Sequence, residues 1–172
     1  MYAPERYKNK NMETSAIPHQ SNPHQVFTPP SALQHLKVFI GQWQINGQNL
    51  DGAPLGADLP VTGEQSYEWF PGHFFMISRW ERQFGDGQYT GLGIISYDPA
   101  THFFSASNYD NLGYARTYKL YQEHGAWKYV GEQERATLEF SPDGNTYNEY
   151  WEIAEEGGNW MPLCRLEGRK IK

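Results

Sequence analysis

Arg116 and Tyr118 are two residues whose types and spacing suggest binding chemistry. Residues two apart in a β-strand point to the same face of the sheet. Where that face lines a cavity, the guanidinium of Arg116 can hold a ligand carboxylate through two hydrogen bonds, and the hydroxyl of Tyr118 can donate a third. The same pattern also occurs on solvent-exposed strand faces, so the pair predicts a carboxylate site only in a strand that faces inward.

Four carboxylates are candidates for acid or base chemistry: Glu64, Glu68, Asp110 and Glu149. Glu64 and Glu68 share a strand face, but four residues span about 13 Å along a strand, which is too far for a catalytic dyad. A buried carboxyl group with a raised pKa can act as a general acid. An enzyme of the lyase, cyclase or isomerase type, with such a group beside an Arg or Tyr that stabilises an oxyanion, is therefore an alternative function.

The sequence offers little for metal, covalent or phosphate chemistry. No two of the six histidines lie with Asp or Glu at a recognisable metal-ligand spacing, so we expect no metal site. A single axial histidine on a barrel wall can hold haem, and His102 and His124 are the candidates; no other cofactor is expected. Cys164 has no disulfide partner and is expected as a small core residue. Gly91 and Gly93 precede no helix and predict a sheet bend or a close-packing site.

Composition and charge narrow the class of protein. The 172 residues fit one domain with a substantial core. The net charge of −6 repels phosphate backbones, so we expect no nucleic-acid partner. No run approaches the roughly 18 apolar residues of a transmembrane helix, and the N-terminus lacks the apolar segment of a signal peptide. We therefore expect a soluble, cytoplasmic protein with no membrane partner.

The N-terminal region differs from the rest of the chain. Residues 1–30 are rich in Asn, Gln, Pro, Ser and His and poor in aliphatic residues, which predicts a disordered tail. Met12 is an alternative to Met1 as the natural start. Residues 31–172 are expected to form the folded domain.

A short helix is predicted at the start of that domain. Ser31 and Gln34 have the spacing of a capping box, in which each side chain satisfies a free backbone N–H group. Three apolar residues recur on one helical face: Leu33, Leu36 and Ile40. Gly41 ends the helix in the usual way. We expect this helix to cover one end of the fold.

From Gln42 onward, apolar and polar residues alternate with a period of two. Turn signals such as Pro71-Gly72 and Asp86-Gly87 separate the alternating segments. About ten strands follow, near residues 42–46, 61–70, 74–84, 89–97, 102–110, 115–122, 126–133, 135–140, 146–154 and 159–169. Tight turns make neighbouring strands antiparallel, and closure removes the two free edges of a meander. The predicted fold class is all-β, a single antiparallel up-and-down β-barrel with one short N-terminal helix.

Several motifs in this order resemble the DUF1579 family of uncharacterised proteins, which is placed among the calycin-like barrels. They are Phe39–Trp43, Glu68–Phe74, Gly91–Pro99, Asp110–Gly113, Trp151-Glu152 and Gly158–Trp160. Gln42 stands where Thr is more usual. The likeness spans about residues 31–169 and implies a barrel, but the family carries no agreed activity and so supplies no catalytic residues.

Three further resemblances concern single motifs. Gly41-Gln42-Trp43 is similar to the Gly-x-Trp signature of lipocalins, which implies that Trp43 closes the barrel floor under an arginine of the last strand, here Arg165 or Arg169. Nitrobindin-type barrels, which also begin with Gly-x-Trp, imply the haem alternative. Arg116-Thr117-Tyr118 resembles the Arg-x-Tyr pair of fatty-acid-binding proteins, although it lies earlier in this chain.

The leading functional prediction is a barrel that binds a small hydrophobic or amphipathic molecule in an aromatic lumen. Aromatic residues make up 16% of the chain, and such residues line ligand cavities as well as sheets. The expected lining residues are Tyr67, Trp69, Arg79, Trp80, Tyr97, Tyr109, Arg116, Tyr118 and Trp151. A shift of one residue in register would turn each of them outward. A structural role with a filled barrel is the remaining alternative.

Overall fold

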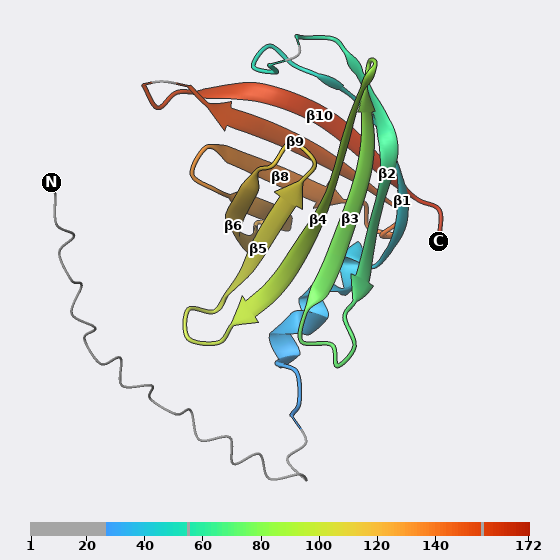
Figure 1. Ribbon diagram of the computed structural model, residues 1–172. Coiled ribbons are helices and arrows are strands. Elements are labelled where there is room, and N and C mark those ends of the chain that lie inside the picture. Colours follow the sequence, from blue (N-terminus) through green and yellow to red (C-terminus); the bar gives the residue numbers. More distant parts are fainter. Residues whose placement is uncertain (1–26, 55, 156) are drawn as a thin grey trace, which may run out of the picture.

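The chain folds into one closed antiparallel barrel (Figure 1). The computed structural model describes residues 27–172 except 55 and 156. The elements are a 3-10 helix η1 (Ser31–Phe39) and strands β1 (Gly41–Asn49), β2 (Pro60–Trp69), β3 (Met76–Phe84), β4 (Gly87–Asp98), β5 (Phe103–Asp110), β6 (Ala115–Glu123), β7 (Ala126–Val130), β8 (Glu134–Phe140), β9 (Thr146–Ala154) and β10 (Trp160–Lys170). The predicted fold class is confirmed. Met1, Met12 and most of the predicted tail lie outside the described residues.

Each strand pairs with its neighbours in the sequence, and β1 also pairs with β10 to close the barrel. The closing pair runs from Trp43 opposite Lys170 to Asn49 opposite Cys164. Every strand therefore has a partner on both sides, although β6 pairs with β7 only over Lys119–Glu123. Among the described residues, no helix is long and apolar enough to span a membrane.

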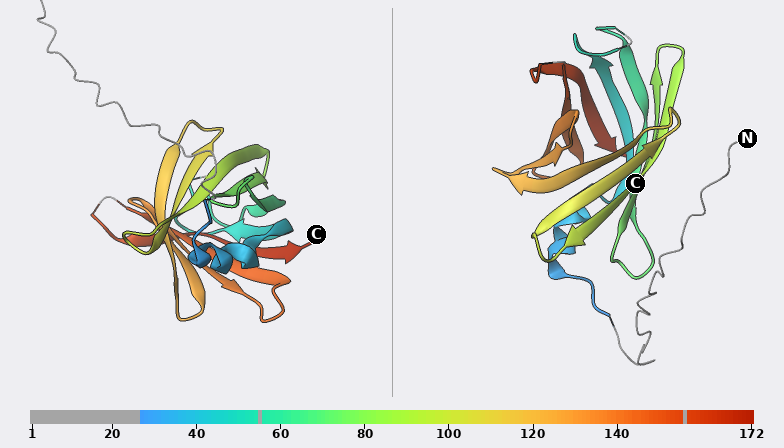
Figure 2. Two further views of the ribbon diagram at one scale, coloured as in Figure 1. Left: turned by 90° about the horizontal axis from the view of Figure 1, so that it is seen from below. Right: turned by 60° about the vertical axis from the view of Figure 1, so that its left-hand side comes forward.

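The helix η1 covers one end of the barrel, as predicted, and lies below the strands in Figure 1 and across the barrel end in the left view of Figure 2. Its buried residues are three apart, Leu33, Leu36 and Phe39. This spacing matches a 3-10 helix, in which side chains at i and i+3 lie directly above one another. The predicted capping box does not form, because Pro30 takes the N-cap position and offers no side-chain acceptor.

Trp43 seals the floor of the barrel beside η1. It is fully buried, and its indole N–H donates a hydrogen bond to the carbonyl oxygen of Phe39 at 2.8 Å. The cation near its ring is Lys170, whose Nζ lies 4.8 Å from the ring centroid. The expectation that Arg165 or Arg169 stacks there is wrong, since both side chains lie on the exposed face of β10.

Strand β10 contains a β-bulge in its first half, before the two arginines. The register of β10 against β9 shifts between Pro162 and Cys164. A bulge adds one unpaired residue, so the alternation of faces changes by one position beyond it. Leu163 and Cys164 consequently both face the interior. Alternation from Cys164, which was expected in the core, places Arg165 and Arg169 on the outer face.

Candidate functional site

A cavity of about 640 Å³ occupies the half of the barrel that lies away from η1. All ten strands contribute to its wall, and loop residues such as Ala53, Pro54 and Leu112 lie at its rim. Pockets of roughly 300–1,000 Å³ are typical of sites for small molecules. The barrel is therefore filled at the helix end and hollow at the other, and we call the hollow part the lumen.

Five of the residues predicted to line the lumen do so, namely Tyr67, Trp80, Arg116, Tyr118 and Trp151. Arg116 and Tyr118 share the inward face of β6, as their spacing predicts. Trp69 and Tyr97 are partly buried and pack against the hydrophobic core instead of lining the lumen.

The other two predicted residues lie on the outside of the barrel. Arg79 has a side chain that is 54% exposed and forms an ion pair with the exposed Glu68. Tyr109 is 51% exposed. The reason is the period of two, because Trp80 and Asn108 face the lumen and therefore turn their neighbours outward. These two expectations are corrected.

A buried polar cluster in the lumen joins residues of β2 and β3 to a residue of β9 on another side of the barrel. Arg82 donates a hydrogen bond from Nη2 to Oε1 of Gln65 at 2.8 Å, and the same nitrogen lies 3.7 Å from Oε2 of Glu149. Glu149 also accepts a hydrogen bond from the indole N–H of Trp151. Burial is the largest single influence on Arg82 and lowers the pKa of its guanidinium, but the charge of Glu149, together with smaller contributions from Tyr147, Cys164 and Tyr67, raises the pKa overall. The arginine is charged and compensated inside the wall.

A second polar cluster surrounds Arg116 nearer to the rim. Its Nη1 donates to Oδ2 of Asp110 at 2.6 Å, and its Nε lies 3.4 Å from Oε1 of Glu134. Tyr118 donates its hydroxyl hydrogen to Oε2 of Glu134 at 2.6 Å. Burial, followed by the charge of Glu134, raises the pKa of Tyr118, so this phenol is neutral at pH 7. Two carboxylates already compensate Arg116, which disfavours the carboxylate site predicted from the Arg-x-Tyr spacing.

The turn after β5 positions Arg116. Oδ1 of Asp110 accepts the backbone N–H groups of Leu112 at 3.0 Å and Tyr114 at 3.1 Å. The side chain of Asn111 accepts the backbone N–H of Thr90 at 3.0 Å and so ties the turn to β4. One carboxylate therefore fixes the turn through one oxygen and the arginine through the other. The segment Asp110–Gly113, noted in the sequence, builds this part of the rim.

Two glycines of β4 make room inside the lumen, as the sequence predicts for a close-packing site. A Cβ atom added at Gly91 would lie 1.9 Å from the ring of Trp80. A Cβ atom added at Gly93 would lie 2.3 Å from Oγ of Ser78 and 2.6 Å from Oδ1 of Asn108. Any larger residue at either position would displace these side chains. The indole of Trp80 therefore lies directly against the wall of the barrel.

Two of the four candidate carboxylates face the interior of the barrel, and the other two lie on its outer surface. Asp110 and Glu149 face inward, whereas Glu64 and Glu68 are exposed on the outer face of β2. The predicted lining omitted most polar residues of the lumen, among them Gln65, Arg82, Asn108 and Glu134. The signal for Arg82 was available, because it follows Trp80 by two residues on the same strand face.

The histidines proposed for haem lie away from the lumen. His102 and His124 are exposed and occupy hairpin turns with positive φ angles of 59° and 49°. His102 shares a hydrogen bond of 3.1 Å between its Nδ1 and the hydroxyl of Tyr97. No group of three metal-binding side chains occurs within the described part of the chain. Cys164 faces the lumen, and burial, followed by the charge of Glu149, raises the pKa of its thiol to about 12.

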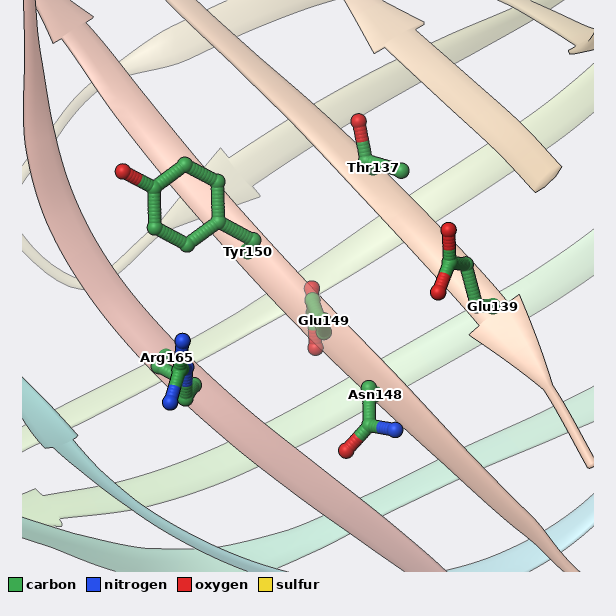
Figure 3. A pocket seen from close by; sticks show the side chains of 6 residues that line it. All are labelled: Thr137, Glu139, Asn148, Glu149, Tyr150 and Arg165. Atoms are coloured by element: carbon green, nitrogen blue, oxygen red, sulfur yellow. The ribbon is translucent and has the colours of Figure 1, made fainter.

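A second hollow, of about 500 Å³, lies on the outer face of β8, β9 and β10 (Figure 3). Its residues are Thr137, Glu139, Asn148, Glu149, Tyr150 and Arg165. Figure 3 shows Thr137, Tyr150 and Arg165 standing apart on three different strands. It also shows Glu149 behind the ribbon of β9, in keeping with its place in the lumen wall. The polar groups of this hollow do not converge, so the lumen is the better candidate site.

Comparisons with known proteins agree with the fold. Residues 28–148 match the model of the family described as "Protein of unknown function (DUF1579)". No curated protein matches the chain. The crystal structure of Rv2717c from M. tuberculosis is similar with a TM-score of 0.62 and 11% identity, covering 84% of this chain and 99% of that one. A de novo designed fluorescence-activating β-barrel has a TM-score of 0.42 and 15% identity, covering 82% of this chain and 98% of the design.

Proposed function

The chain belongs to the DUF1579 family, whose description names no activity, and we propose from the lumen itself that the protein binds a small apolar or amphipathic molecule. The observation that carries this proposal is the cavity of about 640 Å³ inside the barrel. A barrel with a purely structural role would fill this space with side chains, as the helix end does.

The wall of the lumen has the chemistry expected of such a site. Its aromatic members include Tyr67, Trp80, Tyr129 and Trp151, which offer broad apolar surfaces. Its ionised groups already compensate one another, as Arg82 does with Glu149. Small-molecule sites commonly combine apolar walls with a few placed polar groups. An amphipathic ligand would bury its apolar part against the rings.

The test is a titration with N-phenyl-1-naphthylamine, a neutral probe whose fluorescence rises in apolar surroundings. We expect saturable binding to the wild-type protein. Asn108→Trp places a large ring in the lumen from β5 and should abolish or strongly weaken binding. Tyr109→Trp, the matched control, adds its ring on the outside of the same strand and should bind like the wild type.

Two outcomes would contradict the proposal. One is the absence of saturable binding by the wild-type protein, and the other is equal binding by both variants, which would place the probe on the outer surface. Native mass spectrometry of freshly purified protein is an independent readout, because a co-purifying small molecule adds directly to the measured mass.

A second candidate function, proton transfer on a small substrate in the lumen, rests on the pairing of Tyr118 with Glu134 beside Arg116. A carboxylate next to a neutral phenol can act as a base while the phenol or the guanidinium stabilises an oxyanion. The test follows deuterium exchange at the methyl group of 2-acetylnaphthalene in D₂O by NMR. Faster exchange with the wild-type protein than with Glu134→Gln would support proton transfer in the lumen. Equal exchange rates with the two proteins would contradict it.

A further inference from the structure

Two hydrogen-bond donors of the lumen wall are buried without a partner in the described part of the chain. They are the indole N–H of Trp80 and the Nε–H of Arg82. Both residues are 9% exposed and both line the lumen. They occupy successive inward positions of β3, so the two donors belong to one part of the wall. The third such atom, the hydroxyl of Tyr147, is not in the lumen lining.

A buried donor without an acceptor is unusual and costs free energy, because the group has lost its hydrogen bonds to water. Arg82 uses its Nη2 for Gln65 and lies near Glu149, but its Nε remains unpaired. Trp151, by contrast, donates its indole N–H to Glu149. The two fully buried unmatched atoms of this wall are thus both donors, and their complement is an acceptor oxygen.

The charges around the lumen limit the kind of acceptor. The two positive charges of Arg82 and Arg116 are paired with three inward-facing carboxylates, those of Asp110, Glu134 and Glu149. A ligand carboxylate would add a fourth negative charge to a poorly solvated space, where like charges repel strongly. A neutral oxygen, such as that of a ketone, amide or lactone, satisfies the donors without this repulsion.

We infer, on the basis of the proposed function, that the lumen prefers a neutral aromatic or conjugated molecule whose carbonyl oxygen accepts hydrogen bonds from Trp80 and Arg82. The indole of Trp80 lies so close to β4 that Gly91 admits no side chain, and the same ring lines the lumen, where an aromatic ligand can contact it. Both nitrogens are covered by neighbouring groups, so binding requires side chains of this wall to move aside.

The experiment compares three naphthalenes of nearly equal size by isothermal titration calorimetry. These are 2-acetylnaphthalene, a neutral ketone; 2-isopropenylnaphthalene, which has no acceptor; and 2-naphthoate, which is anionic at pH 7. We expect the ketone to bind roughly five- to tenfold more tightly than the alkene, as one or two added hydrogen bonds would provide. The naphthoate should bind more weakly than the ketone.

Trp80→Phe removes the indole N–H and keeps an aromatic ring at the same position. We expect it to lower the affinity for the ketone several-fold and to leave the affinity for the alkene within about twofold. Trp69→Phe is the matched control, because Trp69 packs outside the lumen, and it should bind both compounds like the wild type. Thermal unfolding of each variant establishes that the barrel is intact.

The outcomes separate this inference from the proposed function. If neither the naphthalenes nor N-phenyl-1-naphthylamine binds, the proposed function fails. If the alkene binds as tightly as the ketone, or if Trp80→Phe weakens both equally, the lumen binds ligands but the acceptor inference is overturned. Tightest binding of the naphthoate would overturn the preference for a neutral ligand.

Discussion

The two halves of this barrel use the same strands for opposite purposes. At the helix end, aromatic rings fill the interior with centroids 4.9–5.8 Å apart in edge-on or tilted contacts. The rings are those of Phe39, Trp43, Trp127, Phe140 and Tyr147. In the other half, aromatic residues stand around a lumen that also holds two compensated arginines, and the interior stays hollow.

Strand β9 shows where the change occurs. Its inward residues run from Tyr147, fully buried in the closed end, through Glu149 to Trp151 in the lumen wall. A carboxylate in this middle position cannot pack against rings alone and recruits Arg82 from across the barrel. Along this strand, the side chains at alternating positions change from packed rings to a carboxylate and a ring that line the lumen.

The largest test of this contrast is Phe39→Ala. We expect it to lower the free energy of unfolding by about 3–5 kcal/mol, because Phe39 is fully buried and contacts the rings of Tyr67, Trp127 and Phe140. Urea denaturation followed by tryptophan fluorescence measures the change.

Phe75→Ala is the control, since Phe75 is 44% exposed and its loss should cost less than about 1 kcal/mol. Binding of N-phenyl-1-naphthylamine by the folded Phe39→Ala protein should be unchanged. Loss of binding under conditions where this variant is folded would show that the two halves are not independent.

The second prediction concerns the charged centre of the lumen wall. Glu149→Leu leaves the guanidinium of Arg82 buried without its carboxylate and should lower the free energy of unfolding by about 3 kcal/mol. The double variant Glu149→Leu/Arg82→Met should recover most of that loss, because it removes the unpaired charge as well. Urea denaturation of both proteins measures the difference.

The outer pair Arg79 and Glu68 provides the contrast. Both side chains are more than half exposed, so Glu68→Leu should change stability by about 0.5 kcal/mol or less. A double variant at Glu149 and Arg82 as unstable as Glu149→Leu alone would show that the ion pair is not the source of the loss.

The sequence predicted the fold almost completely, because local signals determine it. Strand β5, for example, was expected over 102–110 and runs Phe103–Asp110, between a turn at Asp98-Pro99 and the turn after Asp110. Alternation and tight turns act over a few residues and are readable without a structure. Closure follows from the length of the meander.

The candidate site was predicted only in part, because it depends on facing and on long-range pairs. Arg79 was expected inside although Trp80 beside it faces the lumen, and the alternation allows only one of them. Arg82 was missed although it shares a strand face with Trp80, because a charged residue in a strand is usually solvated and the Glu149 that compensates it is distant in sequence. The cation near Trp43 is Lys170, which the pairing of β1 with β10 places opposite it, and this long-range register has no local signal.

The third prediction concerns the pH dependence of stability that arises from a buried thiol in the lumen wall. Burial raises the pKa of Cys164 in the lumen wall to about 12 from an ordinary value near 9, so the folded state holds this proton more tightly than the unfolded chain does. Its contribution to stability is complete below about pH 9 and is lost as the pH rises toward 12. By pH 11, the loss from this thiol is roughly 2–3 kcal/mol.

Urea denaturation at pH 7, 9, 10 and 11 measures this decline. Cys164→Ala removes the thiol and should show a shallower decline than the wild type. Part of the decline should remain in the variant, because burial, followed by the charge of Asp110, also raises the pKa of Tyr89 to about 12. Equal slopes for the two proteins would show that the thiol does not contribute.

The smallest expected change in stability comes from substitutions in two hairpin turns, one at each end of the barrel. Asp110 is nearly buried at the rim and holds the N–H groups of Leu112 and Tyr114 as well as Arg116. Asp110→Asn should lower the free energy of unfolding by about 1–2 kcal/mol, because its charge-assisted hydrogen bonds become neutral ones. Asp98, in the turn at the helix end, accepts only local hydrogen bonds and is exposed.

Asp98→Asn should therefore change stability less than Asp110→Asn does, although both remove one carboxylate from a hairpin turn. Hydrogen exchange locates the difference: the amides of Leu112 and Tyr114 should lose protection only in the Asp110 variant. Since that carboxylate also holds Arg116, the rim of the lumen should loosen while the helix end keeps its protection. Equal loss at both ends would mean that the rim turn has no special role in shaping the lumen.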